Sequence, residues 1–444
     1  MAKRRRRQRL PQGTAEIEIE SLSHEGRGVG HLDGKVVFVD FALPGERVEF
    51  KYSKQSKKFD EGRAVNIIKA SDDRIKPICE HFTICGGCSM QHLSNEKQIS
   101  VKQDALMDMF KHMAQTQPQN ILPPLRGPVD HYRQKARLGV KYVEKKGKVL
   151  VGFREKGSAF LADLHSCQVL HESVGDRLTA LSDLIITMDA KSTIPQIEVA
   201  IDDAKTVLVF RHLEPLTDSD RAALTEFAQQ YDFQIMLQSG GPDTVVALWP
   251  ENPPLLSYKL NEQDITIEFQ PNDFTQVNSE INQSMVSSAL SMLELTAEDK
   301  VLDLFCGLGN FTLAMARQCA EIVGVEGAQS MVLKARENAE KNNIKNASFF
   351  AADLSVDISN EPWLQQQYDK ILLDPPRSGA MEMLKHIGKL GAKRIVYVSC
   401  NPATLARDTQ ILVNEYGYTL VDAGVMDMFP HTAHVESIAL FTKK

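Results

Sequence analysis

The sequence predicts a multidomain α/β protein whose C-terminal part folds as a doubly wound, largely parallel sheet. The 444 residues exceed the usual length of one domain. Apolar, strand-like runs alternate with helical stretches in the C-terminal part. The first of these runs is followed by a glycine turn, CGLGN at 306–310. We expect a basic arm at 1–11, a small barrel at 12–70, a mixed α+β region at 71–270 and the sheet at 271–444.

The composition is that of a globular protein of the cell interior. Hydrophobic residues make up 43% and charged residues 25% of the chain, close to globular averages. Neither a secretory signal nor an apolar run of the roughly 18 residues needed to cross a bilayer is evident. The seven cysteines are an odd number in a chain without an export signal, which favours metal binding or catalysis over disulfides. We therefore expect a cytoplasmic protein without membrane contact.

Basic residues gather in the N-terminal third although the net charge is −7. The arm carries Lys3, Arg4, Arg5, Arg6, Arg7 and Arg9, and two further clusters lie at 51–58 and 133–148. Any single cluster could be a solvated surface, but three of them indicate contacts with the phosphates of a nucleic acid.

The segment 14–68 has the pattern of a small antiparallel barrel. Short alternating strands are separated by turns, and glycines recur at Gly26, Gly28 and Gly30. With the stretch VVFVDFALPGE and the closing strand, the segment resembles the TRAM domain, an RNA-binding module of RNA-modifying enzymes. A barrel of this size without a ligand remains the alternative.

Four cysteines suggest an inorganic centre. Cys79, Cys85 and Cys88 form the pattern C-x5-C-G-G-C, and Cys167 lies downstream. Four thiolates suit a zinc ion or an iron-sulfur cluster, and the presence of one CxxC pair instead of two favours the cluster. Because a fourth ligand is available, we expect a closed cluster that is structural or contacts RNA. Four unconnected core cysteines are the alternative.

The region from 168 to 271 mixes strand and helix patterns without a chemical motif, so we expect a scaffold and RNA surface there. Residues 94–113 have apolar side chains at helical spacing and predict a helix.

In the C-terminal part, four predicted strands end at Glu326, Asp353, Asp374 and Cys400. Ligands of open α/β sheets bind at the carboxyl ends of the strands. The glycine turn lacks the third glycine of a dinucleotide site. Glu326 is placed to bind ribose hydroxyls, and Asp353 an adenine amino group, which together describe a site for S-adenosylmethionine. Each acid taken alone could be a cap or turn residue.

The segment SCNP at 399–402 predicts a nucleophilic thiol. Proline cannot continue a strand, so Cys400 should leave the sheet and face the pocket. The sequence DPP at 374–376 resembles motifs of amine methylation, but Arg377 replaces the stacking aromatic residue. C5 of uracil is a poor nucleophile, and addition of a thiolate to C6 would activate it. Glu436 is the candidate base that removes the C5 proton.

Five motifs carry a family resemblance. They are FxQVN at 274–278, DLFCGLGNF at 303–311, LLDPPRSG at 372–379, SCNPATLARD at 399–408 and HTAHVES at 431–437. Together they resemble the RNA uridine-C5 methyltransferase family over essentially the whole chain. The barrel and the cysteines make the chain similar to the iron-sulfur branch that modifies 23S ribosomal RNA.

The resemblance implies a Rossmann-like class I S-adenosylmethionine methyltransferase domain and a role for each motif residue. Cofactor-site roles fall on Gln276, Phe305, Asn310, Glu326, Asp353 and Asp374. Cys400 takes the role of nucleophile and Glu436 that of base, with Asp374 also helping to orient the base. Cys79, Cys85, Cys88 and Cys167 take the role of 4Fe-4S ligands.

The implied substrate is a uridine in a loop or single strand of 23S ribosomal RNA, uridine 1939, modified by a monomer that does not act on DNA. Two alternatives stay open: the same chemistry on a transfer RNA uridine, and a noncatalytic RNA-binding or ribosome assembly factor.

Overall fold

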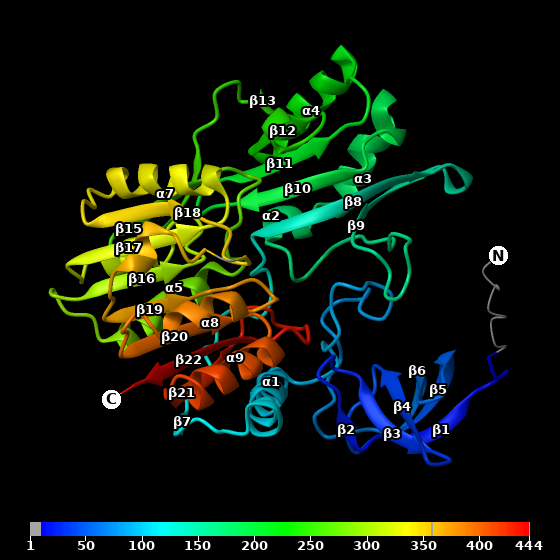
Figure 1. The fold of residues 1–444 in the computed structure, drawn as a ribbon. Helices are drawn as coiled ribbons and strands as arrows, with labels where there is room; N and C mark the ends of the chain where they lie inside the picture. Colours follow the sequence, from blue (N-terminus) through cyan, green and yellow to red (C-terminus); the bar gives the residue numbers. More distant parts are fainter. Residues whose placement is uncertain (1–9, 357, 444) are drawn as a thin grey trace, which may run out of the picture. The chain divides into compact units, whose positions relative to one another are not determined.

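The computed structural model describes residues 10–356 and 358–443 (Figure 1). The basic residues of the predicted arm up to Arg9 lie outside the described residues. The chain divides into two compact units. Of the described residues, the N-terminal unit contains 10–102, 155–158 and 429–434, and the main unit contains 103–154, 159–356, 358–428 and 435–443. The four-part division expected from the sequence stays a prediction.

A six-stranded barrel-like sheet forms the start of the N-terminal unit. Its strands are β1 (Ala15–Glu18), β2 (Ser21–Leu22), β3 (Gly28–Leu32), β4 (Lys35–Asp40), β5 (Arg47–Gln55) and β6 (Phe59–Lys69), in the order β1-β5-β6-β4-β3-β2. Val37, Val39, Val48 and Phe50 are fully or almost fully buried in its core. Gly30 is required by close packing, since a Cβ there would lie 2.2 Å from the carbonyl oxygen of Glu18.

The expectation of a wholly antiparallel barrel is wrong at one pair, because β4 and β6 run parallel. The strand β5 pairs antiparallel with β6, which brings β6 back alongside β4 in the same direction. Helix α1 (Asn95–Met109) and the π-helix η1 (Phe110–Ala114) follow, so the helix expected at 94–113 is present.

A second six-stranded sheet occupies the middle of the chain, within the main unit. Its strands are β8 (Lys135–Val143), β9 (Lys148–Gly152), β10 (Gln196–Ile201), β11 (Thr206–Arg211), β12 (Phe233–Gln238) and β13 (Val245–Trp249), in the order β13-β12-β11-β10-β8-β9. Only β11 and β12 pair in parallel, and α4 (Asp218–Tyr231) makes the crossover between them. The remaining short helices are α2 (Glu172–Gly175), η2 (Glu144–Lys146), α3 (Leu178–Thr187), η3 (Asp189–Ser192) and η4 (Pro242–Thr244).

A hairpin of β14 (Leu256–Leu260) and β15 (Ile265–Phe269) leads into the last domain. Two asparagine side chains, one on helix α7 (Gln329–Lys341) and one at its C-terminal end, bind the free edge of β15. Asn338 Oδ1 accepts a hydrogen bond from the Glu268 N–H at 2.9 Å, and Asn342 Oδ1 accepts one from the Thr266 N–H at 2.8 Å. These amides satisfy backbone groups that the two-stranded sheet would leave unpaired.

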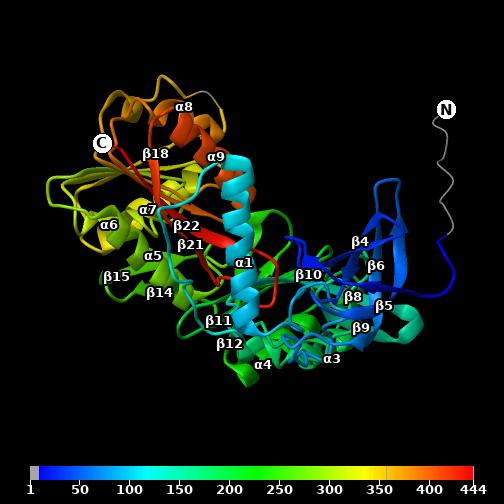
Figure 2. The same ribbon diagram turned by 90° about the horizontal axis from the view of Figure 1, so that it is seen from below.

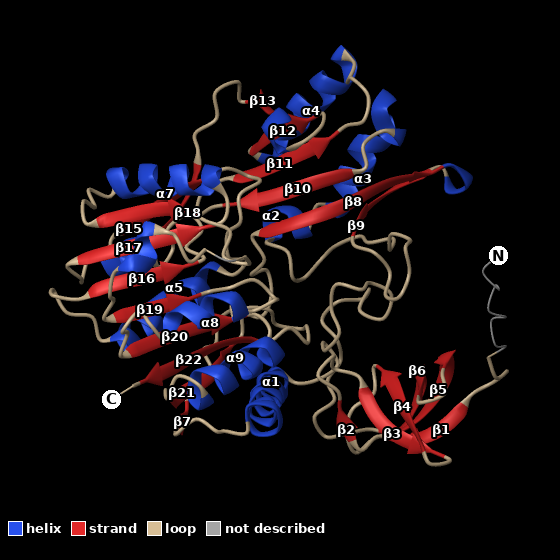
Figure 3. Ribbon diagram, in the orientation of Figure 1, coloured by secondary structure: helices blue, strands red, loops and turns tan. Residues whose placement is uncertain are grey.

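The C-terminal domain is the doubly wound sheet that the sequence predicts (Figure 3). Its strands are β7 (Asn120–Ile121), β16 (Lys300–Leu304), β17 (Glu321–Glu326), β18 (Ala347–Ala351), β19 (Lys370–Leu373), β20 (Arg394–Ser399), β21 (Thr419–Met426) and β22 (Glu436–Thr442), in the order β18-β17-β16-β19-β20-β22-β21-β7. The helices are α5 (Ser279–Leu293), α6 (Thr312–Ala316), α7 (Gln329–Lys341), η5 (Pro362–Gln365), α8 (Met381–Ile387) and α9 (Pro402–Asn414).

Strands β16 to β20 are mutually parallel, and β22 inserts antiparallel between β20 and β21. Figure 2 shows α5 and α6 on one face of the sheet and α8 and α9 on the other. Within residues 10–356 and 358–443, none of the helices is both long and apolar enough to span a bilayer.

Candidate active site

The carboxyl ends of β16, β19 and β20 lie side by side because their pairing is in register. Leu304 pairs with Leu373, and Leu373 pairs with Tyr397. The first residues after these strands therefore meet at one sheet edge, as is usual for ligand sites of open α/β sheets. The residues that reach this edge are Phe305, Asp374 and Cys400, two of them predicted cofactor-site residues and one the predicted nucleophile.

The antiparallel strand β22 brings a fourth group to the same edge. Ser399, the last residue of β20, pairs with Ser437, the second residue of β22. Glu436 begins β22 and is only 4% exposed. The next position of the same register would set Cys400 opposite Glu436. Two residues that are 36 positions apart in sequence are thereby neighbours at the end of the sheet.

The glycine turn after β16 is closed by the predicted ribose carboxylate. Glu326 Oε2 accepts a hydrogen bond from the Gly307 N–H at 3.1 Å, and Oε1 accepts one from the Gly327 N–H at 2.8 Å. Phe305 adopts a left-handed φ of 68°, a conformation uncommon for a non-glycine residue and often found at functional sites. Gly309 has a φ of 94°, which favours glycine.

Asn310 and Asp353 lie in different surroundings. The Asn310 side-chain oxygen accepts hydrogen bonds from the hydroxyl of Tyr258 at 2.9 Å and from Asn282 Nδ2 at 3.0 Å. Asp353 is exposed beyond the end of β18, and hydrogen bonds from the Ser355 side chain and backbone lower the pKa of its carboxyl group. Asp353 is therefore an ionised acceptor at the surface, and Asn310 belongs to an amide network behind the turn.

Gln276 lies on the loop between β15 and α5 and is partly buried. Asn278, two residues later, caps α5 by accepting a hydrogen bond from the Ile281 N–H at 3.3 Å. The loop therefore joins the helix through a fixed cap.

The thiol of Cys400 lies in an acidic, partly buried environment. Burial, followed by the negative charges of Glu436 and Asp374, raises the pKa of the Cys400 thiol to about 11, and the nearby Arg377 opposes this shift. Cys400 remains half-buried. The thiol is therefore protonated at neutral pH in this structure, and its proton has to leave when the sulfur bonds to carbon.

The two carboxyl groups beside the thiol are also shifted. Burial raises the pKa of Asp374 to about 7. Burial, together with the charge of Asp374, raises the pKa of Glu436 well above its ordinary value, against the effect of Arg377. Groups with such shifts at the edge of a sheet are typical of acid-base sites.

Asp303, which is fully buried in β16, was not among the predicted site residues. Its Oδ2 accepts a hydrogen bond from the Thr312 hydroxyl at 2.5 Å, and burial raises the pKa of its carboxyl group to about 8. The charges of Asp374 and Glu326 add to this shift. An acidic residue inside the apolar run VLDLF was the signal that could have identified it.

The loop that carries Arg377 is held by the helix that follows Cys400. Asn401 caps α9 by accepting a hydrogen bond from the Ala403 N–H at 3.2 Å. Its side-chain amide donates to the Arg377 carbonyl oxygen at 2.9 Å. One residue therefore connects the end of β20 to the loop after β19.

Asp408 fixes the far end of the same loop. Its fully buried carboxylate accepts hydrogen bonds from the Ala380 N–H at 2.8 Å, the Tyr397 hydroxyl at 2.7 Å and the Arg407 side chain at 2.8 Å. A Cβ on Gly379 would lie 2.7 Å from this carboxylate, and the φ of Gly379 is 78°. Gly379, Arg407 and Asp408 lie within the sequence motifs, but the motifs did not indicate this positioning role.

Three of the predicted cluster cysteines lie in the N-terminal unit, in a segment of turns. The Cys85 N–H donates to the His81 carbonyl oxygen at 2.8 Å, and the Phe82 N–H donates to the Cys79 carbonyl oxygen at 3.2 Å. The Gly87 N–H donates to Cys85 Sγ at 3.4 Å. Cys79, Cys85 and Cys88 are each half-buried, and Cys167, in the main unit, is also half-buried. By contrast, Cys306 and Cys319 are buried core residues.

The barrel carries a group of aromatic and basic side chains. The rings of Phe38 and Phe59 pack edge to face with centroids 5.5 Å apart. Arg27 lies 5.2 Å from the Phe38 centroid, and Lys54 lies 5.4 Å from the Phe59 centroid. Such a combination suits bases and phosphates of single-stranded nucleic acid.

Two family models match the chain. The model described as tRNA (Uracil-5-)-methyltransferase matches residues 94–444, and the TRAM domain model matches residues 9–68. A curated relative from Alcanivorax borkumensis, a 23S rRNA (uracil(1939)-C(5))-methyltransferase RlmD, is 52% identical over 99% of both chains. The relative of the same description from Francisella tularensis subsp. novicida is 50% identical over 100% of both chains.

A solved structure shares the fold. The Pyrococcus abyssi tRNA (uracil-54, C5)-methyltransferase, solved in complex with S-adenosyl-L-homocysteine, matches with a TM-score of 0.73 at 24% identity, over 96% of this chain and 100% of that one. The order of strands, the thiol beside two carboxyl groups and the match of one family model to residues 94–444 agree with one another. The chain therefore belongs to the tRNA (uracil-5-)-methyltransferase family and carries a TRAM domain at its N-terminal end.

Proposed function

We propose that the chain methylates C5 of uridine 1939 in 23S ribosomal RNA, with S-adenosylmethionine as methyl donor. The observation that carries the chemistry is the Cys400 thiol at the edge of the sheet, within the electrostatic reach of Glu436 and Asp374. The target is supported by full-length relatives of that description at 50–52% identity. Transfer RNA is less well supported, since the solved transfer RNA enzyme is 24% identical.

The proposed reaction has four steps. Cys400 Sγ bonds to C6 of the uracil while its proton passes to the neighbouring carboxylate of Asp374, and the C5–C6 π electrons make C5 nucleophilic. C5 then takes the methyl group from the sulfonium of S-adenosylmethionine, which would leave as S-adenosylhomocysteine. Glu436 removes the proton from C5. The electron pair of that C–H bond restores the C5–C6 double bond and expels Cys400 Sγ.

The cofactor is proposed to lie along the strand ends of β16 to β19. Glu326, already oriented by the N–H groups of the glycine turn, would accept hydrogen bonds from ribose hydroxyls. Asp353, ionised and exposed, would accept from the adenine amino group. Phe305, Asp374 and Gln276 complete the proposed site, and Asn310 is proposed to shape it through its contacts with Tyr258 and Asn282.

We propose that Cys79, Cys85, Cys88 and Cys167 hold a 4Fe-4S cluster. Three half-buried cysteines on adjoining turns fit such a ligand set, and the Gly87 N–H points at Cys85 Sγ as backbone donors do toward cluster thiolates. Bound there, the irons of the cluster would cross-link these four cysteine thiolates.

The cluster proposal predicts a brown protein after purification without oxygen, with about four irons per chain by elemental analysis. Cys88→Ser should lose the colour and most of the iron, because one of four ligands is removed. The matched control Cys319→Ser changes a buried cysteine outside the set and should keep both. A colourless wild-type protein with stoichiometric zinc would contradict the proposal.

The RNA is proposed to bind through the barrel and the basic clusters. Arg27 and Lys54 lie over the rings of Phe38 and Phe59 and are both paired with Glu61, so RNA would have to take over these contacts, its bases replacing the cations on the rings and its phosphates replacing Glu61. The target uridine has to leave its stack to reach Cys400, which costs a few kcal/mol and favours a loop or single strand. We also propose that the protein acts in the cytoplasm as a monomer on RNA and not on DNA.

Mapping of 23S ribosomal RNA tests the function. In cells that lack this protein, we expect the C5 methyl group of uridine 1939 to be absent, and wild-type protein to restore it. Cys400→Ala should not restore it. Loss of a methyl group from transfer RNA alone would assign the other substrate, and unchanged methylation of both RNAs would indicate a noncatalytic role.

A further inference from the structure

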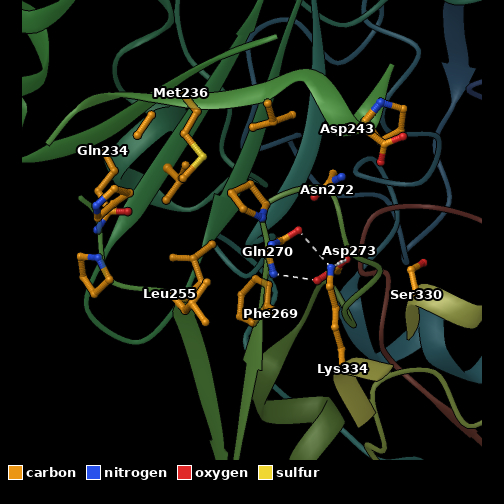
Figure 4. A pocket seen from close by; sticks show the side chains of 18 residues that line it. Gln234, Met236, Asp243, Leu255, Phe269, Gln270, Asn272, Asp273, Ser330 and Lys334 are labelled. Carbon is orange, nitrogen blue, oxygen red and sulfur yellow. Dashed lines mark hydrogen bonds and ion pairs between the residues drawn. The ribbon is translucent and has the colours of Figure 1, made fainter. Parts of the chain in front are cut away.

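The loop 270–278, which carries Gln276, has no regular structure to hold it in place. It connects the end of β15 to the start of α5. A cavity of about 450 Å³ borders its first half, along Gln270 to Asp273 (Figure 4). The loop is therefore not packed on that side, and its position depends on specific polar contacts.

One set of contacts comes from the start of β8. Lys135 Nζ donates to the Pro271 carbonyl oxygen at 2.6 Å and also to the Asp273 carbonyl oxygen. The Gln134 N–H donates to the Val277 carbonyl oxygen at 2.9 Å. The middle sheet thus holds the loop at two points, on both sides of Gln276.

A second set comes from α7. Lys334 Nζ lies 2.5 Å from Asp273 Oδ1 and 3.1 Å from Gln270 Oε1. Figure 4 shows the side chains of Gln270, Asp273 and Lys334 pointing toward one another. The other carboxylate oxygen of Asp273 accepts from the Gln270 N–H at 2.7 Å. Asp273 is 6% exposed, so this ion pair is screened less than a surface pair.

The helix α7 begins three residues after Glu326, the proposed ribose ligand. Lys334 therefore connects the Gln276 loop to the element that carries the other side of the cofactor site. We propose that Lys135 and Lys334 are positioning residues, which hold the loop 270–278 so that Gln276 contacts S-adenosylmethionine. This inference rests on the proposed function, because it takes Gln276 as a cofactor contact.

The charges around Lys135 make the contact sensitive to pH. Burial lowers the pKa of Lys135 to about 8. The facing acids Glu198 and Asp273 oppose this shift, and the facing cations Arg137 and Lys334 add to it. As pH rises through about 8, Lys135 loses its positive charge, and its hydrogen bonds to the two carbonyl oxygens weaken.

Calorimetric binding of S-adenosylhomocysteine to the full-length protein tests the inference. Lys135→Met and Lys334→Met should each weaken binding about tenfold at pH 7, since each removes charge-assisted hydrogen bonds. The control Lys345→Met changes an exposed lysine just after α7 and should bind as wild type does. In steady state, Lys135→Met should raise KM for S-adenosylmethionine and leave kcat within about twofold.

The pH profile supplies a second readout. Wild-type affinity should fall more steeply between pH 7 and pH 9 than the affinity of Lys135→Met, in which only the other groups of the site, such as Asp374, still titrate. Equal affinity of Lys135→Met and wild type at pH 7, or parallel pH profiles, would overturn the inference. If circular dichroism shows that Lys135→Met is unfolded, the inference is tested by the affinity of Lys334→Met and by the pH dependence of wild-type affinity. Failure of the wild-type protein to bind S-adenosylhomocysteine would instead contradict the proposed function.

Discussion

Replacing Cys400 with alanine is expected to lower the rate of methylation about 10⁴-fold or more, the usual effect of removing a covalent nucleophile. Without the sulfur, C5 stays a poor nucleophile, and the neighbouring carboxyl groups cannot supply the missing bond to C6. Methyl transfer to a 23S ribosomal RNA fragment measures this effect. Cys319→Ala, which changes a buried cysteine outside the site, should keep nearly full activity.

The same pair of variants can be tested with RNA that contains 5-fluorouridine. Wild-type protein should form an adduct stable to denaturation, because fluorine cannot be removed as a proton and the C6–S bond persists. Cys319→Ala should form the adduct, and Cys400→Ala should not. An adduct that survives Cys400→Ala would exclude Cys400 as the nucleophile.

Replacing Glu436 with glutamine is expected to allow methyl transfer to C5 but to block release of the methylated RNA from Cys400. The methyl group is transferred to C5, but the amide cannot take the C5 proton, so the methylated RNA stays bound to Cys400. Turnover should fall by about 10² to 10⁴-fold. With ordinary RNA that contains no 5-fluorouridine, a denaturing gel should show a covalent complex of Glu436→Gln and RNA that carries the labelled methyl group.

Glu415→Gln, an exposed carboxylate at the end of α9, is the control and should release its product normally. The pH dependence gives a second check. Because burial raises the pKa of Glu436 well above its ordinary value, the group gains its basic form as pH rises. Release should therefore speed up with pH in the wild type and not in Glu436→Gln. Fast turnover by Glu436→Gln would assign the base to another residue.

Much of the fold and of the chemistry could be predicted from local sequence. The alternation of apolar runs with helical stretches specified the parallel sheet, because each strand has to be buried on both faces. Glycines at 307 and 309 marked the turn, since both residues adopt a positive φ. The position of Cys400 just after a strand could be predicted because a proline two residues later ends the strand and starts α9.

Other features could not be predicted because they depend on pairing between distant segments. The parallel pairing of β4 with β6 follows from where β5 folds back, which strand composition does not specify. Asp408 was part of a recognised motif, but its role depends on the loop that folds against it from the end of β19.

What the sequence by itself determined is the chemical inventory: a thiol at a strand end, acids after strands, a glycine turn and a set of cysteines. These are local properties, since strand ends, turns and residue types are written in neighbouring positions. Only the tertiary structure decided which groups lie close together. The antiparallel insertion of β22 sets Glu436 beside Cys400, and Lys135 reaches the Gln276 loop from another sheet. Such contacts arise from packing between segments that are distant in the sequence. Burial and neighbouring charges therefore shift the pKa values of these groups only once the sheets have formed.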